Sequence, residues 1–134
     1  MYYNKISDIL DQIRRAKTKK DKIEALKINK DNLIFKKILQ YTFSSTVFPV
    51  EKFEPKTAKN EYSVDHNFDV IDNLFVMFTI NPYISNELKM RITSLLEMFD
   101  KTTQNIVNMM LKHDLECGID RQMLVDVFGF AFRD

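Results

Sequence analysis

The sequence predicts an all-α fold, a compact bundle of about six or seven helices with one long loop at about 44–66. Glycine occurs only twice and proline only three times in 134 residues, so few residues interrupt helices. Apolar side chains recur at spacings of three and four along most of the chain, which is typical of helices with one buried face. A chain of this length buries roughly 65–70% of its unfolded surface, enough for a single domain spanning residues 1–134.

Three helices are predicted in the first third of the chain, at about 4–16, 18–28 and 31–43. Thr18 has a hydroxyl that can accept from the first free amides of the second helix. The sequence NKDN at Asn29–Asn32 favours caps and turns, and it therefore separates the second helix from the third. The first apolar stripe consists of Ile6, Ile9, Leu10 and Ile13.

The segment from Ser44 to about His66 has no sustained period and contains two of the three prolines. Loops of this length inside a compact domain are usually functional or mobile, so we expect a contact element or a partly disordered segment. Helical spacing returns at about 68–80 and again after Ser85. A sixth helix is expected to begin at Thr102 or Thr103 and to end at Cys117, followed by Gly118 as a left-handed stop. Asp120 is expected to cap a short seventh helix.

The sequence LKHDLECGID at 111–120 contains the only cysteine, Cys117, four residues after His113. This spacing places both side chains on one helix face, but zinc requires four ligands and no second Cys or His pair is nearby. A thiol nucleophile needs a substrate cleft and oxyanion donors, which the sequence does not identify. We therefore interpret Cys117 as a small buried residue, and we predict neither a metal site nor catalytic residues.

Other function classes are disfavoured by composition. Glycine-rich phosphate loops need more glycine than this chain has, so we expect no nucleotide site. The longest apolar run, LFVMFTI at 74–80, is too short to cross a bilayer, and we expect no membrane association. One cysteine cannot form an intramolecular disulfide and no leader opens the chain, so we expect a monomer in a cytoplasmic setting, the host cytoplasm if the protein is phage-encoded.

Basic residues are concentrated near the amino terminus. Residues 5–37 carry 11 Lys or Arg against 5 Asp or Glu, a net charge of +6, whereas residues 38–134 carry a net charge of −5. Most lysine runs are solvated surface. However, six cations within residues 14–22 repel one another, and a polyanion such as nucleic acid relieves that repulsion and releases its counterions on binding.

Two segments resemble the amino-terminal DNA-binding domain of ATP-dependent DNA ligases of large tailed bacteriophages. They are KTKKDKIEALKINKDNLIFKKILQYTFS at 17–44 and MMLKHDLECGIDRQMLVDVFG at 109–129, and the most specific matches within them are NKDN and DLECG. The resemblance implies a helical domain that holds the backbone of nicked duplex DNA across the minor groove without reading sequence. The middle of the chain, roughly 45–100, matches only as a pattern of helices.

The resemblance also implies what the chain does not do alone. The ligase motif of a lysine, a spacer residue, aspartate and glycine is missing, so ATP and Mg would belong to separate nucleotidyltransferase and OB-fold domains. His113 stands where the phage enzymes tend to have arginine, which makes a phosphate contact there weaker and pH-dependent. The predicted DNA-binding residues are Arg14, Arg15, Lys17, Thr18, Lys19, Lys20, Lys22, Asn29, Lys30, His113, Gly118 and Arg121.

Three alternatives stay open from sequence. The chain is also compatible with a helical protein-interaction module whose loop at 44–66 docks a replication partner such as a sliding clamp. It is compatible as well with a stand-alone DNA-binding protein, or with a subunit that works beside a separate catalytic ligase domain. In the resemblance-based reading, the DLECG segment is mainly architectural, with backbone contact to a phosphate as a secondary role.

Overall fold

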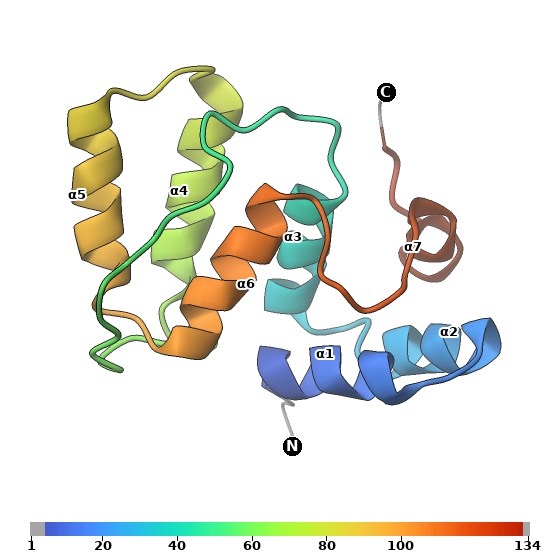
Figure 1. Ribbon diagram of the computed structural model, residues 1–134. Helices are drawn as coiled ribbons and strands as arrows, with labels where there is room; N and C mark the ends of the chain where they lie inside the picture. Colours follow the sequence, from blue (N-terminus) through green and yellow to red (C-terminus); the bar gives the residue numbers. More distant parts are fainter. Residues whose placement is uncertain (1–4, 133–134) are drawn as a thin grey trace. The chain divides into compact units, whose positions relative to one another are not determined.

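The computed structural model describes residues 5–132, which form seven helices (Figure 1) and confirm the all-α prediction. Apart from one isolated bridge between Tyr62 and Phe99, these residues contain no β structure. The helices are α1 (Ile6–Arg15), α2 (Lys19–Ile28), α3 (Leu33–Thr42), α4 (Phe68–Ile80), α5 (Asn86–Leu96), α6 (Lys101–Leu111) and α7 (Arg121–Phe128).

The chain divides into two compact units. One combines the residues up to Ser45 with those from His113 onward, and we call it the terminal unit. The other is the continuous segment Thr46–Lys112, which we call the inserted unit. The terminal unit thus contains α1, α2, α3 and α7, and its two halves are separated in sequence by the whole of the inserted unit.

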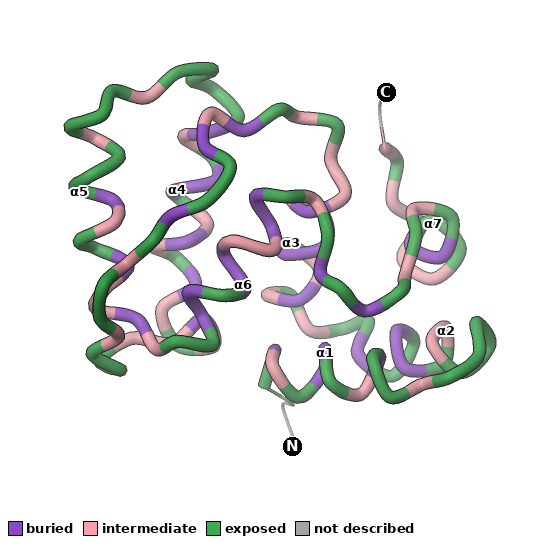
Figure 2. Tube along the Cα trace, viewed as in Figure 1, coloured by how far each residue is buried: buried purple, intermediate pink, exposed green. Residues whose placement is uncertain are grey.

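The three amino-terminal helices begin and end close to their predicted positions, and polar side chains cap the second and the third. Thr18 Oγ1 accepts from the Asp21 amide at 3.1 Å, and Asn32 Oδ1 accepts from the Phe35 amide at 3.0 Å. Apolar residues of these helices and of the segment after His113 form the core of the terminal unit, where buried positions are purple in Figure 2. Its most deeply buried members include Ile6, Ile9, Ile13, Leu26, Phe35, Ile38, Leu39, Leu115 and Leu124.

The predicted end of the sixth helix is wrong. Helix α6 ends at Leu111, and His113 already adopts a left-handed conformation with φ of 60°. The Asp114 carboxylate then accepts from the Glu116 amide at 2.8 Å, a local turn that competes with helix continuation. Cys117 therefore lies in a loop rather than in a helical turn, although it is buried as predicted. Gly118 is left-handed, with φ of 72°, but it does not end a helix.

The carboxyl-terminal helix follows the prediction. Asp120 caps it by accepting from the Met123 amide at 2.9 Å, and Gly129 ends it with φ of 71°. A short aromatic series continues beyond this stop, in which the rings of Phe128 and Phe130 stack with centroids 5.0 Å apart. Phe128 also contacts core residue Phe35 edge to face, so the segment after α7 is attached to the core of the terminal unit.

The long loop, predicted at about 44–66, is part of the core of the inserted unit. Phe53 is only 1% exposed and stacks on Phe78 of α4, while Phe48 packs edge to face on Phe75. The side-chain amide of Asn108 in α6 bonds both the amide and the carbonyl of Phe53, at 2.8 and 2.9 Å. The bonds to Asn108 replace the backbone hydrogen bonds that a helix or strand would supply. The ring contacts leave Phe48 and Phe53 unavailable to a partner protein.

Two further polar residues of α6 hold the same loop. The buried Gln104 amide donates to the carbonyls of Thr57 and Leu96, each at 2.8 Å. Thr103 is also buried, and its hydroxyl accepts from the Val64 amide at 2.9 Å. Buried polar side chains that are fully bonded in this way fix one conformation, because every alternative leaves a donor or acceptor without a partner.

The loop should therefore contribute to stability as a core element does. We expect Phe53→Ala to lower the free energy of unfolding by about 3–5 kcal/mol, since it removes a fully buried ring. Val47→Ala is the matched control in the same loop, because Val47 is 85% exposed, and it should change stability by less than about 0.5 kcal/mol. Urea unfolding followed by circular dichroism measures both. Equal stability of the two variants would contradict the packing of this loop.

Candidate nucleic-acid interface

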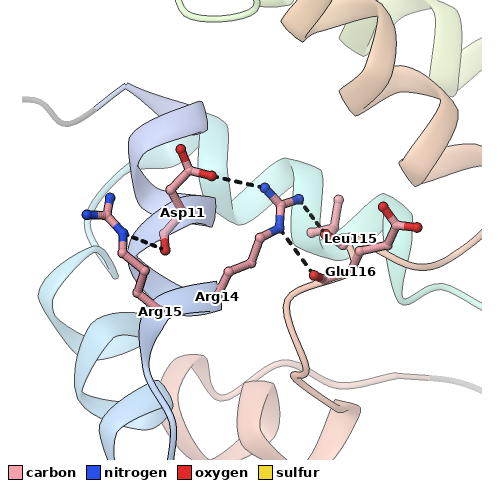
Figure 3. A network of polar contacts seen from close by, with 5 residues as sticks. All are labelled: Asp11, Arg14, Arg15, Leu115 and Glu116. Carbon is pink, nitrogen blue, oxygen red and sulfur yellow. Dashed lines mark hydrogen bonds and ion pairs between the residues drawn. The ribbon is translucent and has the colours of Figure 1, made fainter.

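Four exposed cations gather where α1 ends and α2 begins. We call Arg15, Lys17, Lys19 and Lys20 the basic patch, and all four side chains are exposed. Arg15 Nε donates to the Asp11 carbonyl at 3.3 Å (Figure 3). In the part of the chain that the structure describes, none of the four forms a salt bridge with a carboxylate. The patch thus presents positive charge to solvent over a short stretch of backbone.

Two residues of the basic patch occupy a position that is unfavourable for helix stability. Lys19 and Lys20 lie in the first turn of α2, where the helix dipole already places partial positive charge. Asp21 is the single acidic residue in that turn and offsets part of this effect. Residues 14–22 carry six cations against this one carboxylate, so these cations repel one another. A bound anion would relieve both the repulsion and the dipole effect.

Arg14 has a different role from its neighbour Arg15. Its guanidinium donates to the carbonyls of Leu115 and Glu116, at 2.8 and 3.2 Å, and also pairs with Asp11 at 3.2 Å (Figure 3). These bonds connect α1 to the loop before α7, about a hundred residues away in sequence. Arg14 is therefore engaged in holding the terminal unit together.

Lys22 makes the next bonds in the same series. Its ammonium group donates to the carbonyls of Ile13 and Cys117, at 2.8 and 2.9 Å. Together, Arg14 and Lys22 bond the three consecutive carbonyls of Leu115, Glu116 and Cys117. A Cβ added at Gly118 would lie 3.2 Å from Lys22 Cε, so the glycine allows the lysine side chain to approach as well as supplying the left-handed turn.

Three further residues predicted to bind DNA make hydrogen bonds within the terminal unit. Asn29 is buried, and its amide donates to the Ala25 carbonyl at 2.8 Å and to Gln12 Oε1 at 3.2 Å. His113 Nδ1 lies 2.9 Å from the Thr42 carbonyl. Arg121 Nε donates to the Phe43 carbonyl at 2.9 Å, and its guanidinium lies over the ring of Phe132. All three residues fasten elements of the terminal unit to one another.

The predicted site residues thus form two groups. Those of the first group are exposed and form no salt bridge among the described residues; they are Arg15, Lys17, Lys19, Lys20 and Lys30. Those whose side chains or backbone shape the terminal unit are Arg14, Thr18, Lys22, Asn29, His113, Gly118 and Arg121. Sequence reasoning did not separate the groups, because nothing in a run of cations shows which of them bond distant carbonyls.

The Cys117 thiol is unsuited to nucleophilic chemistry. Burial raises the pKa of the thiol to about 11, and the nearby charges of Arg14 and Lys22 lower it only in part. A cysteine with this pKa is protonated near neutral pH, and the thiolate is the reactive form. Among residues 5–132, no group of three or more His, Cys, Asp or Glu side chains is placed to hold a metal ion.

No helix among the described residues has both the length and the apolar character that a membrane span requires. No protein-family model matches the chain, and no curated protein matches it either. The assignment of the candidate interface therefore rests on the charges and contacts of the described residues.

The different roles of Lys20 and Lys22 are testable by one matched pair of substitutions. We expect Lys22→Met to lower the free energy of unfolding by about 1.5–3 kcal/mol, the range for hydrogen bonds made by a charged group. Lys20→Met removes the same charge from an exposed position and should stay within about 0.5 kcal/mol of the parent protein. Thermal and urea unfolding provide the comparison. If both variants unfold like the parent, the link between Lys22 and the Cys117 carbonyl is not a stabilising contact.

Proposed function

We propose that the terminal unit binds duplex DNA independently of sequence, through backbone phosphates. The observation that carries the proposal is the basic patch, four exposed cations that form no salt bridge with a carboxylate among the described residues, two of which, Lys19 and Lys20, stand in the first turn of α2 where the helix dipole disfavours positive charge. Lysine and arginine side chains on phosphates supply most of the affinity in non-specific DNA binding. Such contacts carry no sequence information, so unrelated duplexes are expected to bind alike.

The structure also changes which cations are expected to bind phosphates. Lys22 is near the patch in sequence, but its ammonium group is bonded to two carbonyls, so we assign it to the fold. Arg15 replaces it as the fourth phosphate contact, beside Lys17, Lys19 and Lys20. Lys30 is exposed in the turn after α2, where the exposed Asp31 follows it.

A quadruple variant tests the assignment. Replacement of all four residues of the basic patch by alanine should abolish the salt dependence of binding, because four phosphate contacts give a log–log slope of about −3.6. Each single alanine variant should reduce the magnitude of the slope by about one. Fluorescence anisotropy with two duplexes of unrelated sequence, titrated at several salt concentrations, measures both quantities.

The control has the same change in net charge. Lys56, Lys59, Lys89 and Lys101 are exposed lysines of the inserted unit, and their fourfold replacement by alanine should leave DNA affinity close to that of the parent. If the two quadruple variants lose affinity equally, net charge rather than the basic patch determines binding. If the patch variant binds like the parent, the DNA assignment for this surface is wrong.

We further propose that the chain serves an ATP-dependent DNA ligase as its DNA-binding domain. The support is the resemblance of the segments at 17–44 and 109–129, which fall almost entirely within the terminal unit. In this role the chain holds nicked DNA, while ATP and Mg are bound by nucleotidyltransferase and OB-fold domains. The proposal requires no catalytic residue in this chain.

Fusion to the catalytic domains of a phage ligase tests this role. We expect the fusion to lower the KM for nicked DNA relative to the catalytic domains alone, and to leave the rate of enzyme adenylation by ATP unchanged. This pattern is expected because a domain that only binds DNA contributes to substrate affinity and not to the reaction with ATP. The fusion that carries the quadruple alanine variant should show no gain. A parent fusion without any change in KM would argue against the ligase role.

A protein-interaction role is a second candidate, for a different surface. Phe48 and Phe53 of the long loop are buried, so their rings do not supply a docking surface. Exposed apolar residues do occur around the connection between α4 and α5 in the inserted unit, where Ile80 and Tyr83 are 70% and 87% exposed. Saturable binding of a sliding clamp, lost in an Ile80→Ser, Tyr83→Ser variant and without any DNA binding, would favour this role over the first.

A further inference from the structure

The amino-terminal half of α2 has little apolar packing to hold it in place. The two buried apolar residues of this helix, Ala25 and Leu26, both lie in its second half. None of residues 17–24, all of which the structure describes, is buried, although Ile23 is half-buried. This is the segment that carries three of the four cations of the basic patch, so polar contacts must do much of the work of fixing their position.

Lys22 joins this half of α2 to the end of α1. Its ammonium group donates to the Ile13 carbonyl at 2.8 Å, and the same carbonyl accepts from the Ala16 amide at 3.2 Å. Ile13 is among the last four residues of α1, whose carbonyls lack the partners that another helical turn would supply. A cation at the carboxyl end of a helix is also favoured by the helix dipole. Lys22 therefore caps α1 from within α2.

A second contact fixes Lys22 from the other side. Its ammonium group donates to the Cys117 carbonyl at 2.9 Å, and Gly118 lies so close that a Cβ there would be 3.2 Å from Lys22 Cε. The half-buried lysine side chain is thus held between the end of α1 and the loop before α7. Because Lys22 lies one helical turn after the amino end of α2, these bonds determine where that end lies.

The basic patch spans the junction that Lys22 holds together. We call residues 13–22 the corner. Arg15 is the last residue of α1, whereas Lys19 and Lys20 begin α2. The residues between the two helices are not helical, and Ala16 and Thr18 have extended backbone conformations. The spacing between the cation on α1 and those on α2 therefore depends on the angle between the helices, which the bond from Lys22 to Ile13 restrains.

We propose that Lys22 is a positioning residue for DNA binding, which contacts no phosphate and holds the corner in the arrangement that the duplex backbone binds. The inference rests on the proposed DNA binding and adds the residue that prepares the surface for it. Cations that are fixed before binding do not lose this freedom on binding. Without Lys22, all four phosphate contacts can form, but the free protein adopts the binding arrangement for only part of the time.

The test compares Lys22→Met with Lys20→Met in the full chain. Lys22→Met should lower DNA affinity about fivefold, the loss expected if about one molecule in five has the binding arrangement. Its log–log salt slope should stay near about −3.6, because the four phosphate contacts remain. Lys20→Met removes a contact and should reduce the magnitude of the slope by about one. Fluorescence anisotropy measures binding at several salt concentrations, at a temperature where circular dichroism shows every variant to be folded.

Gly118→Ala tests the same inference without any change in charge. The added Cβ forces the Lys22 side chain to shift, since it would lie 3.2 Å from Lys22 Cε. We expect weaker DNA binding with an unchanged salt slope, as for Lys22→Met. An affinity equal to that of the parent would attribute the effect of Lys22→Met to its lost charge and would overturn the inference.

Two controls exclude general effects of charge and stability. Lys56→Met removes the charge of an exposed lysine in the inserted unit. Ile38→Val shortens a fully buried side chain of α3 and lowers stability without a change at the corner. Both variants should bind DNA like the parent. If either weakens binding as much as Lys22→Met does, a general effect explains the loss and the positioning role is rejected.

The outcomes separate this inference from the proposed function. If the parent binds DNA through the basic patch and Lys22→Met binds equally well, Lys22 serves the fold alone, and the inference is wrong while DNA binding stands. If Lys22→Met reduces the salt slope as Lys20→Met does, Lys22 is itself a phosphate contact and the inference is again wrong. If the parent does not bind duplex DNA, the proposed function fails and the inference fails with it.

Discussion

The terminal unit depends on the bonding of three consecutive carbonyls by two cations. Arg14 and Lys22 reach the carbonyls of Leu115, Glu116 and Cys117 from α1 and α2. The loop from His113 to Asp120 forms neither helix nor strand, and His113, Glu116 and Gly118 adopt left-handed conformations. The carbonyls of this loop therefore lack the partners that a helix would supply. Charge-assisted bonds supply the partners that such carbonyls need. They close the unit across a sequence separation of about a hundred residues.

This arrangement explains why the amino-terminal cations are not equivalent. Arg14 and Lys22 bond carbonyls about a hundred residues away in sequence and so support the fold. Arg15, Lys17, Lys19 and Lys20 are exposed, and the hydrogen bond of Arg15 is local, to the Asp11 carbonyl of its own helix. The helix dipole at the start of α2 strengthens the distinction, because Lys19 and Lys20 are placed where acidic residues would stabilise the helix.

Much of the helical pattern could be predicted from sequence, because apolar spacing and polar caps act locally. Thr18 and Asp120 cap the helices that they were predicted to cap, and Asn32, in the segment where caps and turns were predicted, caps α3. The end of α6 was missed because a left-handed histidine ends it well before the glycine, and histidine carries no strong signal for that conformation. The burial of the long loop was missed because Asn108 and Gln104 bond its backbone from a distant helix. Neither amide is recognisable as an anchor without the fold.

The candidate interface, like the fold, could be predicted only in part from the sequence. Charge density identified the candidate segment, but the sequence could not show which of its cations bond distant carbonyls. The division changes the physical argument for DNA binding. A run of six equivalent cations is explained as well by a solvated surface as by a ligand. Once Arg14 and Lys22 are assigned to the fold, the exposed cations of this segment are reduced to Arg15, Lys17, Lys19 and Lys20. Solvation alone accounts for their exposure, but it does not account for two lysines in the first turn of α2, where the helix dipole disfavours cations and a phosphate would offset the cost.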